Sequence, residues 1–250
     1  MHRFAAPVAC LVAIALTPAF GAADAVDRMS RTMPLVATGA ILVDATIADL
    51  TITAADRPDV QIDIERHAPV RADFARFPAA IDPTDAGLHV SVVQGADARD
   101  SRLKATIAIT APAAAVFPSV RVFEGHVRIS NVRSAADVDI QRGTIEATRL
   151  AGRVRLESEM GGIDVRDAEL TPSGMLRLRV FNGPLRVRFG RPPANARILA
   201  VTLNGGITSD IPLTMKDRFG PRFGETTIGT GDPVLSMDVV KGDIAVSVGR

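Results

Sequence analysis

Apolar and polar residues alternate in short runs through the second half of the chain, and each pair of runs flanks a glycine. Alternation with a period of two predicts a β-strand with one buried face, because successive side chains point to opposite sides. The glycines recur about every 20 residues, with one interval close to twice that length. They are Gly125, Gly143, Gly162, Gly183, Gly205 and Gly242. Such repeats predict units that stack and cover one another's apolar faces.

This pattern predicts an all-β protein and favours a β-solenoid, a β-helix-like coil of stacked ~20-residue glycine-turn repeats. A strand, a turn such as Asn182-Gly183 and a second strand also describe a β-hairpin, so an antiparallel β-sandwich of hairpins is the alternative. A sandwich does not require near-equal spacing, which is why we prefer the solenoid. We expect Gly143, Gly162, Gly183, Gly205 and Gly242 to align at the turns of successive units.

The inward positions of these runs predict one continuous core. Its expected members are Val154, Leu156, Ile163, Val165, Leu178, Val180, Leu185, Val187, Ile198, Met237, Val239, Ile244 and Val246.

The first half of the chain fits the same scheme less regularly. Alternation predicts strands over residues 41–43, 50–53, 60–64, 88–93 and 104–110. The proline-containing segment 68–85 predicts a loop or a short helix around Phe74. The segment 209–232 interrupts the repeat, and we expect either a loop over the edge or a repeat with a long excursion.

Residues 1–25 predict a secretory signal peptide. A basic start, Met1-His2-Arg3, precedes the apolar run 5–16, and small residues such as Gly21, Ala23 and Ala25 follow it. The run is too short for a transmembrane helix, and the small residues offer cleavage positions. The single cysteine, Cys10, lies inside this segment, so the mature chain would hold neither a thiol nor a disulfide. We expect residues 26–250 to form a single domain that reaches the periplasm, the cell surface or the medium.

Composition narrows the range of partners. The chain is 47% hydrophobic but only 4% aromatic, with no Trp and no Tyr, and this scarcity of rings argues against a surface on which bases or sugars stack. The formal net charge is +1, so no bulk charge attracts nucleic acid. After the signal segment no apolar run reaches membrane length. We therefore expect neither a nucleic-acid partner nor a membrane span in the mature protein.

The sequence carries no recognisable catalytic or cofactor motif. Its histidines have no metal-ligand spacing, and no nucleophile elbow, phosphate-binding loop or dinucleotide fingerprint occurs. We therefore expect no catalytic residue, no metal and no cofactor. One acidic set could place carboxylates on adjacent units, at separations that suit glycan cleavage, but we prefer to interpret it as an ordinary charged surface. That set is Asp137, Asp139, Glu157, Glu159 and Asp164.

Arginines occupy polar positions of the alternating runs in neighbouring units. They are Arg153, Arg155, Arg177, Arg179, Arg186 and Arg188. If the units stack in register, four or more guanidinium groups form a ladder on one solvent face. Such a ladder could hold an acidic polymer, because guanidinium groups bind carboxylate, sulfate and phosphate in bidentate fashion. We prefer the interpretation that these arginines form a solvated face balanced by Glu157, Glu159 and Asp164.

The glycine-based motifs resemble those of the bacterial "putative adhesin" domain family. The likeness rests on Asn204-Gly205-Gly206-Ile207, on Val239-Val240-Lys241-Gly242-Asp243-Ile244 and on the opening runs 48–52 and 60–64. It covers roughly residues 35 to 250 and departs from the common Ser/Asn-Gly-Asp-Ile pattern at Gly125 and Gly143. The resemblance implies an exported β-solenoid without a known activity, and it supplies no catalytic residue.

Three functions remain in a definite order of preference. The first is a non-enzymatic exported cell-envelope module, structural or adhesin-like. The second is a binding protein for an anionic glycan or lipid headgroup that uses the arginine face, with an envelope component or an acidic polysaccharide as its partner. The third is a polysaccharide lyase or hydrolase, which the scarcity of aromatic rings disfavours.

Overall fold

The computed structural model describes residues 24–95, 99–172, 174–216 and 220–249. Within them the protein is all-β: eighteen strands belong to one continuous mixed sheet, and the one described helix is the short 3-10 helix η1 (Arg71–Arg76). The predicted signal peptide lies outside the described residues apart from Asp24 and Ala25. None of the described helical structure has the length and apolar character needed to cross a bilayer.

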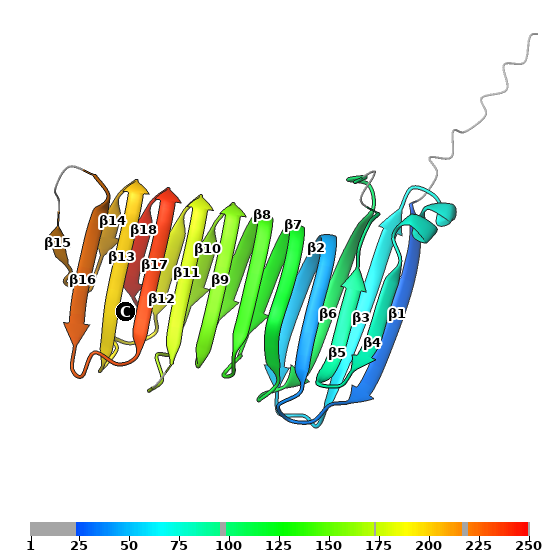
Figure 1. The fold of residues 1–250 in the computed structure, drawn as a ribbon, viewed down its shortest axis with the longest axis horizontal. Coiled ribbons are helices and arrows are strands. Elements are labelled where there is room, and N and C mark those ends of the chain that lie inside the picture. The colour runs from blue at the N-terminus through cyan, green and yellow to red at the C-terminus, as the bar shows by residue number, and fades with distance from the viewer. Residues whose placement is uncertain (1–23, 96–98, 173, 217–219, 250) are drawn as a thin grey trace, which may run out of the picture.

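The strands follow one another with short connections (Figure 1). The first half of the chain contains β1 (Ala25–Pro34), β2 (Ala40–Ala55), β3 (Asp59–Ala68), β4 (Ala79–Thr84), β5 (Gly87–Val92), β6 (Lys104–Pro112), β7 (Val116–Ser130) and β8 (Ala136–Thr148). The second half contains β9 (Arg153–Met160), β10 (Ile163–Arg166), β11 (Met175–Asn182), β12 (Leu185–Phe189), β13 (Ala196–Asn204), β14 (Ile207–Ser209), β15 (Thr214–Lys216), β16 (Arg222–Ile228), β17 (Val234–Lys241) and β18 (Ile244–Val248).

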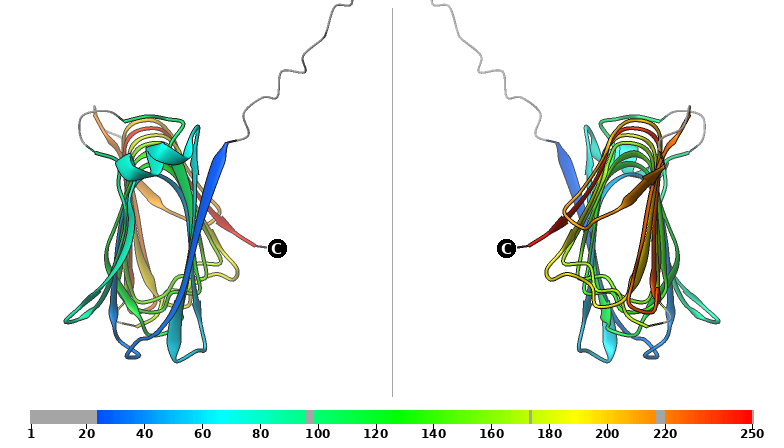
Figure 2. Two further views of the ribbon diagram at one scale, coloured as in Figure 1. Left: turned by 90° about the vertical axis from the view of Figure 1, so that its right-hand side faces the viewer. Right: turned by 90° about the vertical axis from the view of Figure 1, so that its left-hand side faces the viewer.

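The sheet turns a corner within each repeat and so forms two walls that face each other (Figure 2). Wall A consists of β5, the first parts of β2, β7 and β8, and then β9, β11, β17 and β13, all joined by parallel pairing. Wall B consists of β6, the second parts of β2, β7 and β8, and then β10, β12, β18 and β14, also in parallel. Each repeat therefore contributes one strand segment to each wall.

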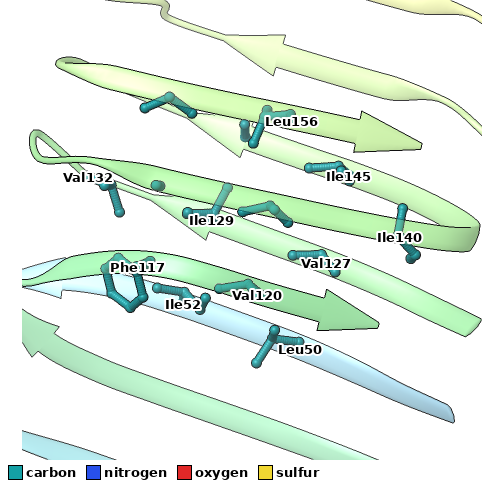
Figure 3. Packing of buried hydrophobic residues seen from close by; sticks show 14 of the residues in the cluster. Leu50, Ile52, Phe117, Val120, Val127, Ile129, Val132, Ile140, Ile145 and Leu156 are labelled. Atoms are coloured by element: carbon teal, nitrogen blue, oxygen red, sulfur yellow. The ribbon is translucent and has the colours of Figure 1, made fainter. Parts of the chain in front are cut away.

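Aliphatic side chains from both walls fill the space between them. Leu50 and Val127 from wall B meet Val120, Ile140 and their neighbours from wall A (Figure 3). All thirteen predicted core residues belong to this single cluster and are at most 3% exposed, so that prediction is confirmed. At about 1.5–3 kcal/mol for each fully buried side chain, this packing is the main stabilising contribution.

Turn glycines stack at the corner, but one of them differs from the prediction. Gly161, not Gly162, continues the column: its φ is +142°, and a Cβ there would lie 1.8 Å from the carbonyl oxygen of Gly143. The next repeat places Gly183 in the same way over Gly161. In the pair Gly161-Gly162 the first residue turns the corner, and the second already leads into β10.

The order of repeats in space differs from their order in the chain. The C-terminal unit, β17 with β18, is inserted between the unit of β11 and β12 and the unit of β13 and β14. Accordingly Gly242 lies between Gly183 and Gly205 in the glycine column. The long glycine interval noted in the sequence reflects this insertion, because strands β15 and β16 lie within it.

Antiparallel strands close both ends of the stack. At the far end β16 pairs with β13 and β15 pairs with β16, so the segment 209–232 is an excursion that contains strands. At the near end β1 pairs with β3, and β3 pairs with β6. Strands β1, β4, β15 and β16 were not predicted, since few apolar residues alternate in them.

Arg66 ties the near end together. Its side chain is 12% exposed, forms an ion pair with Asp27 of β1 and donates hydrogen bonds to the carbonyl oxygens of Phe74 and Phe77. This single guanidinium therefore links β1 and the segment of η1 to β3.

Candidate anion-binding site

The predicted arginines divide between the two walls. Arg153 and Arg155 on β9 and Arg177 and Arg179 on β11 point outward from wall A. Arg186 and Arg188 lie on β12 and therefore project from wall B, on the opposite side of the stack. The alternation predicts that all six side chains point outward, but it does not show on which wall each one lies. The corner at Gly183 lies between Arg179 and Arg186 and so places them on different walls.

Register decides which of the four wall A arginines are neutralised. Arg155 forms an ion pair with Asp137 of β8, at 3.2 Å, and a second with Glu157 on its own strand. Arg179 lies opposite Glu157 across the β9–β11 pairing, with Nη1 3.8 Å from Oε1. These exposed pairs are worth about 0–1 kcal/mol each, but they satisfy the two guanidinium groups in the absence of a ligand.

Arg153 and Arg177 form no ion pair with any carboxylate of the described residues. Arg177 lies opposite Arg155, and Arg153 lies opposite Met175. The two free guanidinium groups thus occupy diagonal positions on adjacent strands, about 8 Å apart at the Cα atoms by sheet geometry. They leave uncompensated positive charge at one place on wall A.

A shallow groove of about 320 Å³ lies at this place. Its lining combines Arg153, Arg155, Arg177 and Asp137 with apolar surface from β7, β8, β9 and β11. The apolar contributors are Pro118, Ala135, Ala136, Val154 and Met175. The parallel register of β7 and β8 shifts between Phe117 and Val120, just where the groove begins. Its volume falls at the lower end of the range for small-molecule sites.

Arg186 and Arg188 have different surroundings. Their parallel neighbours are Asp164 and Arg166 on one side and Ala245 and Ser247 on the other. Asp164 is engaged by Arg166 at 2.8 Å, so both β12 arginines lack an ion pair among the described residues. They are exposed, as Arg153 and Arg177 are, but they do not line this groove.

The acidic set also divides between the walls. Asp137, Asp139, Glu157 and Glu159 lie on wall A, whereas Asp164 lies on wall B. Burial raises the pKa of the Asp139 carboxyl, and the neighbouring carboxylates of Glu157 and Glu159 raise it further. Asp139 lies on the open face of β8, between Arg121 and Glu157 in the register, and is not part of the groove lining.

Sequence reasoning missed the apolar part of this site. Met175 and Ala135 stand at polar positions of their alternation, so they were assigned to neither the core nor a site. Met175 is 45% exposed. Its position opposite Arg153 depends on the length of the connection between β10 and β11, which the pattern of the strands does not determine.

No family model matches the chain, and no curated protein matches it. Solved structures do resemble it. A putative cell adhesion protein from Clostridium sporogenes is similar with a TM-score of 0.48 and 9% identity, over 89% of this chain and 100% of the other. A putative adhesin from Bacteroides fragilis is similar with a TM-score of 0.31 and 14% identity, over 89% and 97%.

A third solved structure is a putative lipid binding protein from Parabacteroides distasonis. It has a TM-score of 0.26 and 7% identity, over 90% of this chain and 97% of the other.

Proposed function

We propose that this chain is an exported, non-enzymatic module of the bacterial cell envelope, adhesin-like or structural, with residues 26–250 folded as a single β-solenoid domain. The parallel pairing along both walls supports a solenoid over a sandwich of hairpins, because hairpin neighbours would pair in antiparallel fashion. The single hydrophobic cluster, which extends from Leu35 to Val246, supports one domain.

The observation that carries the proposal is the regular outer surface of wall A. Parallel register places Arg121, Asp139, Glu157, Arg179 and Asp238 side by side on five successive strands. A rigid face with charges at the interstrand spacing of about 4.8 Å suits contact with an extended partner. Contact of this kind requires neither a moving lid nor an enclosed binding pocket.

Export is tested by expressing the full chain in a Gram-negative host and sequencing the N-terminus of the fractionated protein. We expect cleavage after Gly21, Ala23 or Ala25, with the protein in the periplasm or the medium. Replacing Leu11 and Ile14 by Asp should retain the uncleaved protein in the cytoplasm. Uncleaved wild-type protein in the cytoplasm would contradict the proposal.

A second candidate function is binding of an anionic glycan or lipid headgroup, and the free guanidinium groups of Arg153 and Arg177 favour it. We expect weak binding of heparin fragments that falls steeply with salt, because screening shortens electrostatic reach to about 8 Å at physiological ionic strength. Replacing Arg153 and Arg177 by Gln should reduce binding more than tenfold.

The matched control is the pair Arg186→Gln and Arg188→Gln, which removes the same charge from exposed, unpaired arginines on the opposite wall. Equal losses for both variants, or equal affinity for heparin and a neutral polysaccharide, would remove the wall A arginines from the binding function.

A further inference from the structure

The groove beside Arg153 and Arg177 combines two kinds of surface that an extended polyanion does not need together. The unpaired charge of its lining is confined to Arg153 and Arg177, because Arg155 is already engaged by Asp137 and Glu157. The uncharged part of its lining is apolar and includes the Pro118 ring, the methyl group of Ala135 and the thioether chain of Met175. A hydrophilic polymer would leave that apolar lining in contact with water or with its own hydroxyl groups.

We propose that this groove binds one molecule of an anionic amphiphile, with a phosphate or sulfate headgroup between Arg153 and Arg177 and a hydrocarbon chain along Met175, Ala135 and Pro118. This inference rests on the anion-binding function proposed above and names its ligand class. Two guanidinium groups match a tetrahedral oxyanion, since each can donate two parallel hydrogen bonds. The ion pair with Asp137 holds the Arg155 guanidinium toward β8. Only the guanidinium groups of Arg153 and Arg177 are then left to bind the anion.

Apolar contact would then supply most of the discrimination among anions. Each CH₂ group that is removed from water on binding improves affinity by a factor of about four. A groove of about 320 Å³ accommodates a headgroup and part of an alkyl chain, and the rest of the chain would remain in solvent or in a lipid phase. The adaptable, exposed side chain of Met175 suits contact with such a chain.

Decyl phosphate, kept below its micellar concentration, is the test ligand, and inorganic phosphate and a heparin fragment are the comparisons. Calorimetry should give at least about tenfold tighter binding of decyl phosphate than of inorganic phosphate. Methyl NMR provides a local readout, because the chain contains only seven methionines and the Met175 signal can be assigned with a Met175→Gln variant. That signal should shift with decyl phosphate and not with phosphate.

Three variants separate the contributions. Met175→Gln should weaken decyl phosphate about fivefold and leave phosphate and heparin unchanged. Arg153→Gln with Arg177→Gln should weaken decyl phosphate by more than tenfold, whereas Arg186→Gln with Arg188→Gln should not affect it.

The outcomes distinguish the two proposals. If heparin binds through Arg153 and Arg177 but decyl phosphate is no tighter than phosphate, the amphiphile is excluded and anion binding stands. If the affinities for heparin and for decyl phosphate are both unchanged by the substitutions of Arg153 and Arg177, the anion-binding function and the amphiphile site are both excluded. If phosphatidylglycerol vesicles bind while monomeric decyl phosphate leaves the Met175 signal unshifted, wall A contacts a membrane surface and the single-molecule site is overturned.

Discussion

A methyl group added at Gly161 would collide with the backbone of the preceding repeat. The added Cβ would lie 1.8 Å from the carbonyl oxygen of Gly143, and the φ of +142° disfavours any L side chain. Backbone atoms of a stacked neighbour cannot move aside without breaking the parallel pairing on both walls. The glycine column is thus a steric requirement of the corner.

We therefore expect Gly161→Ala to lower the free energy of unfolding by at least about 3 kcal/mol. Gly190→Ala is the control, because its nearest contact would be 3.4 Å away at the side chain of Asp167. That variant should stay within about 0.5 kcal/mol of the wild type in urea denaturation. Similar stabilities for the two variants would show that the corner tolerates a Cβ.

The raised pKa of Asp139 makes the stability of the protein depend on pH. Because burial and nearby carboxylates raise its pKa, the folded protein holds this proton at a higher pH than the unfolded chain. The free energy of unfolding should therefore fall as pH rises from the ordinary carboxyl value of 3.8 through the raised pKa, and stay lower above it.

Asp139→Asn should thus stabilise the protein by about 0.5 kcal/mol at pH 7 and lose this advantage below about pH 3.5. Asp137→Asn serves as the comparison, since it removes an ion pair with Arg155 and should bring no gain. Thermal unfolding at the two pH values decides the matter, and an equal gain for both variants would contradict the assignment to Asp139.

At the scale of elements, the interior of the stack was predictable and its ends were not. Strands such as β9, β11 and β12 alternate strictly because both walls bury one face against the same core. Strand β1 covers only the end of the core, so it tolerates Asp27 at a half-buried position and leaves Arg31 exposed, and these charged residues obscure the apolar pattern. For the site, the arginines could be found from the sequence, but their distribution over two walls depends on where each corner falls.

The test at this scale is a substitution of Arg66, whose side chain is only 12% exposed. Arg66→Met leaves Asp27 and two carbonyl oxygens without their donor, so we expect a loss of about 3 kcal/mol. Hydrogen exchange should show β1 losing protection first. Arg28→Met removes the ion pair between Glu65 and the 72% exposed side chain of Arg28, which joins the same two strands, and should cost at most about 1 kcal/mol. Equal costs would show that Arg66 does not hold this end.

At the scale of the whole molecule, the C-terminal unit pairs with other units of the sheet on both of its sides. Met237 in β17 is fully buried, and its strand pairs with β11 and β13. We expect Met237→Ala to cost about 2–5 kcal/mol and to increase hydrogen exchange in both β11 and β13. Met215→Ala, at an exposed methionine of β15, should change stability by less than about 0.5 kcal/mol. Faster exchange in β17 alone would indicate that the unit is only loosely inserted.

The inserted unit also fixes when the stack can be completed during synthesis. Strands β13 and β14 are synthesised before β17 and β18. The unit of β13 and β14 therefore cannot pair with the rest of the sheet until the strands that lie between them have been made. Until residues 234–248 emerge, β11 and β12 present open edges of the kind that capture strands from other chains. Pairing of β17 and β18 with β11 and β12 removes these open edges, so the last strands to be synthesised are the ones that protect the sheet from pairing with another chain.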